Sequence, residues 1–200
     1  MDLAGVVVLG CLVSVGGGTM RDLLLGRSVF WVSNPTFVLV AAVTALAVVP
    51  LARTRVLDVL DRYRVVQVVG AAGMALFAVI GTNIALVAGS NRAAAVIVGV
   101  VSGVGGGVIR DIFADQIPEV LRNGQVYASA ALVGATVYVV LLELDVSVVL
   151  AFWIAFSVIL AARTLSLYSG LGIPTFHYER PAGDDRSDPQ TGRGVRVVGS

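Results

Sequence analysis

A heptapeptide with the pattern GGGxxRD occurs twice in this chain, at residues 16–22 and again 89 positions later, at residues 105–111. Each copy lies inside a long apolar stretch. Consecutive glycines disfavour a helix, because each costs about 1 kcal/mol relative to alanine. An arginine inside a membrane span costs about 2.5–3.5 kcal/mol on the insertion scale. A chain that contains both unfavourable features twice is predicted to need them for its function. We therefore expect an internally duplicated membrane protein in which two broken helices face each other.

Charged residues are few and are clustered between the apolar runs. Hydrophobic residues make up 57% of the chain and charged residues 14%, against about 25% charge in a soluble domain. The chain has one cysteine, Cys11, and one histidine, His177, so the usual residues for metal ligation and for Ser/His or Cys/His catalysis are missing. The net charge of +1 and the lack of a basic tract argue against a nucleic-acid partner. We expect a polytopic membrane protein that is not an enzyme and holds no metal or cofactor.

Six apolar runs are each long enough to cross a bilayer as a helix, which takes about 20 residues with some allowance for tilt. They lie at about residues 4–25, 36–52, 66–89, 93–113, 125–142 and 147–167. From residue 170 onward the chain is rich in Pro, Gly, Asp, Arg and Ser, a composition typical of disorder. The sequence therefore predicts six spans in the lipid bilayer and one disordered tail.

The arginines outside the motifs give an orientation. Most of them follow the second, fourth or sixth span: Arg53, Arg55, Arg62, Arg64, Arg122, Arg163, Arg180, Arg186, Arg193 and Arg196. If the six spans alternate, these segments lie on one side, and cytoplasmic loops are the ones enriched in arginine. We therefore expect a multi-pass protein of the cell membrane with a cytoplasmic C-terminus.

The two motifs lie three crossings apart, in the first and the fourth span. Three is an odd number, so the two copies run in opposite directions, as in the inverted repeats of many transport proteins. If the motif marks the middle of three helices, residues 66–142 form repeat two, and repeat one, residues 1–65, lacks its first helix. The last transmembrane helix is then residues 143–169, followed by the cytoplasmic tail, residues 170–200. The predicted fold is an all-α polytopic membrane protein of inverted three-helix repeats plus a final helix, with six spans present.

The motifs are also the predicted pore or ion-binding site. A glycine interruption frees carbonyls that could bind a cation and amides that could bind an anion. Adjacent Arg and Asp side chains point in different directions on a helix. Each aspartate is therefore expected either to neutralise an arginine of another element or to cap a helix end. The candidate residues are Gly16, Gly17, Gly18, Arg21, Asp22, Gly105, Gly106, Gly107, Arg110 and Asp111.

Close packing of helices is the alternative role for the glycines, because small residues let two backbones approach. Small-residue stripes occur at Gly10, Ser14 and Gly18 and at Gly99, Gly103 and Gly107. Packing explains the stripes, but it leaves unexplained why three glycines are twice followed by Arg-Asp. Thr82 and Asn83 have two possible roles as well, lining the same cavity or forming hydrogen bonds between helices.

The chain resembles the prokaryotic relatives of the trimeric intracellular cation (TRIC) channels, a domain family also labelled glycine transporter. The resemblance covers about residues 3–169 and is carried by residues 16–26, Phe30-Trp31, residues 103–111, Pro118-Glu119-Val120-Leu121 and Tyr127-Ala128. It implies a seven-helix protomer in a homotrimer, with a pore in each protomer where two glycine-kinked helices cross. The pore would pass monovalent cations, chiefly potassium. On this resemblance we expect the family's first helix to be missing from the sequence, so that the six spans would correspond to its helices two to seven.

Two functions remain open on the sequence. In a cation channel, freed carbonyls would coordinate potassium, and the arginines would act as gates or as charges paired with Asp22 and Asp111. In a secondary carrier for glycine or another small zwitterion, Arg21 or Arg110 would bind the carboxylate and the carbonyls would bind the ammonium group.

Overall fold

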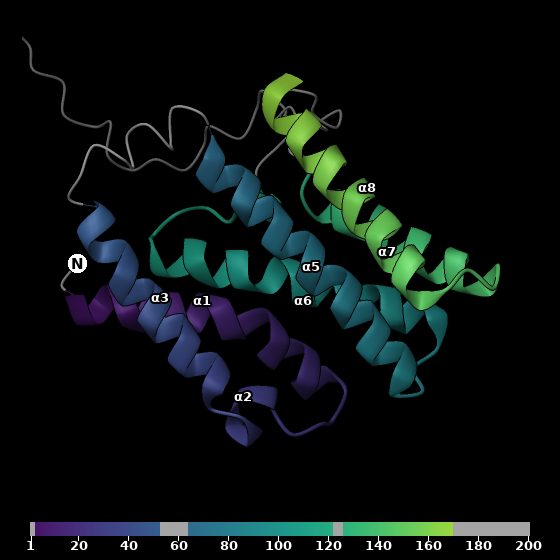
Figure 1. Cartoon of the computed structure of the whole chain (residues 1–200), viewed down its shortest axis with the longest axis horizontal. Helices are drawn as coiled ribbons and strands as arrows, with labels where there is room; N and C mark the ends of the chain where they lie inside the picture. The colour runs from purple at the N-terminus through teal and green to yellow at the C-terminus, as the bar shows by residue number, and fades with distance from the viewer. Residues whose placement is uncertain (1–2, 53–63, 122–125, 170–200) are drawn as a thin grey trace, which may run out of the picture.

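The computed structural model describes residues 3–52, 64–121 and 126–169 (Figure 1). Within these ranges every regular element is a helix. The helices are α1 (Leu3–Leu24), α2 (Phe30–Ser33), α3 (Thr36–Ala52), α5 (Val65–Val87), α6 (Arg92–Phe113), the short 3-10 helix η1 (Glu119–Leu121), α7 (Ala128–Glu143) and α8 (Val148–Ser169). The predicted tail, residues 170–200, lies outside the described residues, as does most of the arginine-rich segment at residues 53–64.

Six of these helices match the six predicted spans in order. Helices α1, α5, α6 and α8 are long and apolar enough to cross a membrane, and α3 and α7 are shorter apolar helices. Large apolar side chains are exposed on their outer faces, among them Leu39, Val69 and Trp153. An apolar exterior of this extent is unfavourable in water and suits contact with lipid. The chain is a multi-pass membrane protein.

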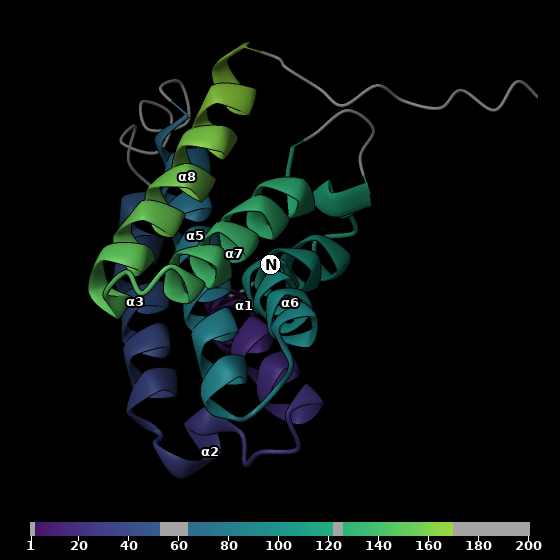
Figure 2. The same cartoon turned by 90° about the vertical axis from the view of Figure 1, so that its right-hand side faces the viewer.

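Helices α1 and α6 lie side by side in the middle of the bundle and run in opposite directions (Figure 1), as the odd number of crossings predicts. Helix α3 packs on α1, and α5 packs on α6. Helices α7 and α8 pack on each other and on α5. The short helix α2 and the C-terminal end of α8 lie at opposite ends of the molecule in both views (Figures 1 and 2).

The duplication extends past the heptapeptide into the turns that follow it. Helices α1 and α6 are each followed by a left-handed residue, Gly26 with φ 63° and Asp115 with φ 53°, again 89 positions apart. The amide of the next residue donates to the carbonyl of the motif aspartate, at 2.9 Å for Asp22 and 2.8 Å for Asp111. This is the Schellman ending of a helix. The two halves therefore have the same backbone conformation at this turn as well as the same sequence motif.

Thr82 and Asn83 both serve packing and lie outside the cavities described below. The hydroxyl of Tyr138, which is fully buried on α7, donates to Asn83 Oδ1 on α5 at 2.9 Å. The Thr82 hydroxyl donates to the carbonyl of Ala78, one turn earlier in α5, at 2.9 Å. It also packs against Gly99, where a Cβ would overlap it. Of the two alternatives, hydrogen bonding between helices holds for Asn83.

Candidate functional site

The glycine triplets lie inside continuous helices. Helix α1 runs unbroken through residues 16–18, and α6 runs unbroken through residues 105–107. The prediction that the triplets interrupt the helices and free backbone carbonyls is therefore wrong. Intrinsic propensity is a weak preference that tertiary packing overrides, and here the two glycine faces pack against each other.

The two backbones touch where α1 crosses α6. A Cβ on Gly17 would overlap the carbonyl oxygen of Ser102, and one on Gly106 would lie 2.7 Å from the carbonyl oxygen of Val13. A Cβ on Gly105 would lie 3.2 Å from the Gly17 Cα. No larger residue fits at these positions without a shift of backbone. Close packing, the alternative reading of the glycines, accounts for this crossing.

Each motif arginine pairs with its own neighbouring aspartate. Arg21 Nε and Nη2 both lie 2.8 Å from Asp22 Oδ1. Arg110 Nε and Nη2 both lie 2.8 Å from Asp111 Oδ1. The expectation that each aspartate neutralises an arginine of another element is wrong, because the long arginine side chain folds back over the adjacent residue.

The second oxygen of each aspartate caps a short helix, which confirms the capping alternative. The amide of Phe30, the first residue of α2, donates to Asp22 Oδ2 at 2.8 Å. The amide of Glu119, the first residue of η1, donates to Asp111 Oδ2 at 2.8 Å. In each half the acceptor precedes the donor by eight residues. The motif aspartate thus ties the end of one helix to the start of the next.

The two ion pairs differ in their exposure. The side chains of Arg21 and Asp22 are 6% and 4% exposed, and the Phe30 ring lies 5.5 Å from the Arg21 guanidinium as a cation–π contact. The Arg110 side chain is 46% exposed. Glu119 occupies the position that Phe30 holds in the first half. One pair is therefore sealed by an aromatic ring, and the other is open beside a carboxylate.

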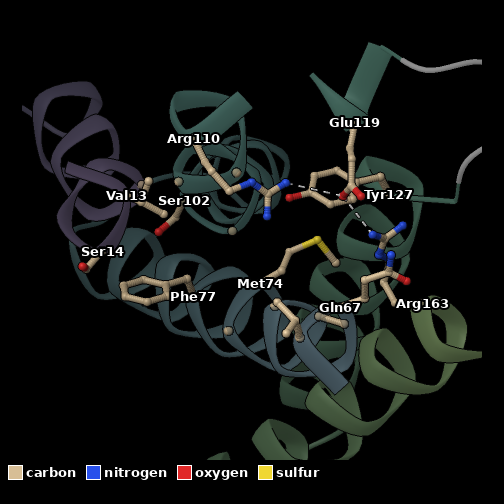
Figure 3. A pocket seen from close by; sticks show the side chains of 18 residues that line it. Val13, Ser14, Gln67, Met74, Phe77, Ser102, Arg110, Glu119, Tyr127 and Arg163 are labelled. Atoms are coloured by element: carbon tan, nitrogen blue, oxygen red, sulfur yellow. Dashed lines mark hydrogen bonds and ion pairs between the residues drawn. The ribbon is translucent and has the colours of Figure 1, made fainter. Parts of the chain in front are cut away.

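A cavity of about 280 Å³ lies against the glycine face of α6 (Figure 3). Its walls come from α1, α5 and α6, from η1, and from Tyr127 and Arg163. In Figure 3, Ser102 and Phe77 lie at one end of it, and Glu119 and Arg163 lie at the other. The Ser102 hydroxyl is buried and has no hydrogen-bond partner within the described part of the chain.

The charged end of this cavity is organised around Glu119. Its Oε2 accepts a hydrogen bond from Arg163 Nη2 at 3.1 Å and lies 4.0 Å from Arg110 Nη2 (Figure 3). Arg163 is 3% exposed, and its guanidinium lies 4.4 Å from the centre of the Tyr127 ring. Its Nη1 donates to the carbonyl of Val126 at 3.2 Å.

The predicted site residues do not all meet in one place. Four of them line this cavity: Gly17, Gly106, Gly107 and Arg110. Arg21 borders a separate apolar cavity of about 860 Å³ between α1, α3 and α5. The other five predicted residues line neither cavity. Gly16 and Gly105 lie at the helix crossing, Gly18 packs against the Phe30 ring, and Asp22 and Asp111 hold the ion pairs.

Sequence reasoning missed three residues of the charged end. Arg163 was counted among the cytoplasmic charges that follow the sixth span, but it is buried within α8, so that count is wrong for this arginine. Its position inside an apolar run is a signal that could have marked it, because ionisable residues in spans are rare and functional. Sequence reasoning assigned Glu119 and Tyr127 no role at this site, although the motifs of the family resemblance include both. Their contacts with Arg163 depend on the packing of α8.

Known proteins share both the sequence and the fold of this chain. The family model described as Glycine transporter matches residues 1–53 and 67–143. The crystal structure of the TRIC trimeric intracellular cation channel orthologue from Rhodobacter sphaeroides is 38% identical and covers 86% of each chain, with a TM-score of 0.78. The chain belongs to the TRIC family. A second solved TRIC cation channel is 31% identical over 90% of this chain and 87% of that one, with a TM-score of 0.79. These TRIC neighbours are channels, which supports the prediction that this TRIC-family chain is not an enzyme.

Curated relatives of this TRIC-family chain are described as membrane proteins. The UPF0126 inner membrane protein YadS of Escherichia coli K12 is 43% identical over 145 residues, which is 69% of this chain. A UPF0126 membrane protein of Vibrio cholerae is 35% identical over 178 residues, covering 88% of this chain and 72% of the relative. The match spans 65% of the length of YadS.

Proposed function

We propose that the chain is a channel for monovalent cations, chiefly potassium, and that the ions pass through the cavity along α6. The observation that carries the proposal is a cavity with charged and polar side chains in its wall, inside a bundle of apolar helices. Ser102, Arg110, Glu119 and Arg163 are among the residues that line it. Ser102 Oγ and Arg163 Nε are buried and have no hydrogen-bond partner among the described residues, which is rare for polar atoms inside a folded protein. The solved TRIC relatives, described as cation channels, support this function.

The motif residues have different roles under this proposal. Gly17, Gly106 and Gly107 leave the cavity wall without side chains, so backbone forms part of the ion path. Arg110 is half exposed to the same cavity and is held by Asp111, which suits a tethered charge or a gate. The remaining motif residues support the path by closing the helix crossing and by fixing the short helices.

We further propose the organisation that the sequence predicts. The repeats would be residues 1–65 and 66–142, with residues 143–169 as the final span and residues 170–200 as a cytoplasmic tail in the cell membrane. The match of backbone endings and caps across the two halves supports the repeats. The Rhodobacter relative is described as trimeric, which supports a homotrimer with one pathway in each protomer.

Reconstitution tests the function directly. In planar bilayers with a potassium chloride gradient, the purified protein is expected to give potassium-selective single-channel currents. Arg110→Ala is expected to change the unitary conductance or the open probability by about twofold or more, because it removes a charge from the cavity wall. Currents identical to wild type in that variant would remove Arg110 from the path.

A cysteine at Ser102 tests the course of the path. Cys11 is the only cysteine of the chain, so Cys11→Ser provides a background without thiols. In that background Ser102→Cys is expected to lose most of its current when a small charged thiol reagent is added, because residue 102 lines the cavity and modification would narrow it. Ser129→Cys is the matched control, since the Ser129 hydroxyl is also buried and unpartnered but lies outside the cavity lining. Equal block of both variants would contradict this course.

A carrier for glycine or another small zwitterion is the second candidate function. Arg110 and Glu119 present opposite charges to one cavity, as the carboxylate and ammonium groups of such a substrate require. The carbonyls of a broken helix, which the sequence suggested for the ammonium group, are unavailable because both helices are continuous. Saturable glycine uptake into proteoliposomes that show no ionic current would favour this function over the channel.

A further inference from the structure

Glu119 is the carboxylate most accessible to the cavity among the three that lie near the motifs. The Asp22 and Asp111 side chains are 4% and 8% exposed, and both oxygens of each accept hydrogen bonds. The Glu119 side chain is 23% exposed and lines the cavity. We propose that Glu119 sets the charge selectivity of the pathway by cancelling the positive charge of the arginines at its end. This inference rests on the proposed channel function.

The charges at this end balance only when Glu119 is present. Arg110 is neutralised by Asp111 through two contacts of 2.8 Å. Arg163 is neutralised by Glu119 at 3.1 Å, the single ion pair that the described residues give it. Without Glu119, the cavity wall carries an uncompensated buried arginine, which raises the energy of a cation nearby and lowers that of an anion.

The backbone of Glu119 takes part in helix capping, and its side chain does not. Its amide is the group that Asp111 caps, and in the first half the same duty falls to the amide of Phe30. An apolar side chain at that position therefore satisfies the fold. A carboxylate at position 119 is not needed for the capping of η1, so its charge is available for another function.

The contacts of Glu119 also leave one side of it open. Within the described part of the chain, Oε2 makes all of the contacts of its carboxylate, with Arg163 and with Arg110. The Arg110 contact, at 4.0 Å, is too long for a hydrogen bond. Oε1 is therefore the carboxylate oxygen that a passing cation could meet.

The test is the reversal potential of single-channel currents under a potassium chloride gradient, which gives the ratio of potassium to chloride permeability. Glu119→Gln is expected to lower this ratio at least about threefold, even if the charge and the ion interact through a medium with the dielectric constant of bulk water. Glu119→Asp keeps the charge and is expected to retain most of the selectivity. Combining Glu119→Gln with Arg163→Gln removes one charge of each sign and is expected to restore the ratio toward the wild-type value.

Glu143→Gln is the matched control. Glu143 pairs with Arg92, the two side chains being 42% and 71% exposed, and it lies away from the cavity. Its neutralisation is expected to leave the permeability ratio unchanged. The same ratio in Glu119→Gln as in wild type would overturn the role of Glu119 and leave the channel intact. Absence of any wild-type current would instead overturn the proposed function.

A folding failure of Glu119→Gln would not end the test. Arg163→Gln alone leaves Glu119 uncompensated and is expected to raise the permeability ratio. A ratio that stays the same or falls in Arg163→Gln, in protein that elutes as wild type does on size exclusion, would overturn the inference. A structural role of the ion pair would lower stability in both single variants without moving selectivity in opposite directions.

Discussion

Gly17→Ala is expected to destabilise the protein by about 3 kcal/mol, the upper end of the usual cost of overpacking. The added methyl group would overlap the carbonyl oxygen of Ser102, which belongs to the backbone of α6 and cannot rotate away. The two central helices would have to separate, and the cavity between them would change shape. We expect a lower unfolding temperature in detergent and the loss of most of the current in bilayers.

Gly73→Ala is the matched control for the loss of stability. Gly73 lies within α5 on the wall of the cavity along α6, and a Cβ there would meet nothing within 4 Å. The same methyl group is expected to be neutral, or to stabilise the helix by up to about 1 kcal/mol, because alanine favours helix over glycine. Equal unfolding temperatures for the two variants would show that the contact between α1 and α6 does not constrain the fold.

Asp22→Asn is expected to cost about 3–5 kcal/mol, the range for breaking a buried ion pair by removing one partner. The amide would leave the Arg21 guanidinium buried beneath Phe30 without a counter-charge. It would also weaken the cap on α2, because an amide oxygen is a poorer acceptor than a carboxylate. Chemical unfolding of the purified variant measures the loss.

The internal repeat supplies the comparison for this second prediction. Asp111→Asn removes the equivalent charge, but Arg110 is 46% exposed and lies 4.0 Å from Glu119. Water and the second carboxylate can stabilise the unpaired guanidinium, so we expect about half the cost of Asp22→Asn. If the two variants lost equal stability, the difference in burial between the two halves would have no energetic consequence.

The spans and their directions could be predicted from sequence because they depend on local properties. Apolar runs of sufficient length form helices in lipid whatever their partners. Residues 16–22 and 105–111 are separated by an odd number of membrane crossings, so the two helices that contain them must be antiparallel. Which ends of the helices face the cytoplasm stays a prediction.

The behaviour of the glycines could not be predicted in the same way. Helix propensity reports the cost that Gly17 or Gly106 imposes on its own helix, whereas the compensating contact is made by the backbone of the other helix. The contact of Arg163 with Glu119 joins residues 44 positions apart through the docking of α8. Nothing in the spacing of residues indicates such a contact, so the charged end of the cavity emerged only from the structure.

The contrast between Phe30 and Glu119 has a consequence for transport. The two halves have the same backbone conformation. If their side chains also matched, an ion would meet the same energy barrier from either side of the membrane. Here the Phe30 ring borders the apolar cavity between α1, α3 and α5, whereas the Glu119 carboxylate lines the cavity along α6. On the proposed route the free-energy profile is therefore expected to be asymmetric, so inward and outward currents at equal driving force are expected to differ in size. Such a channel is a rectifier.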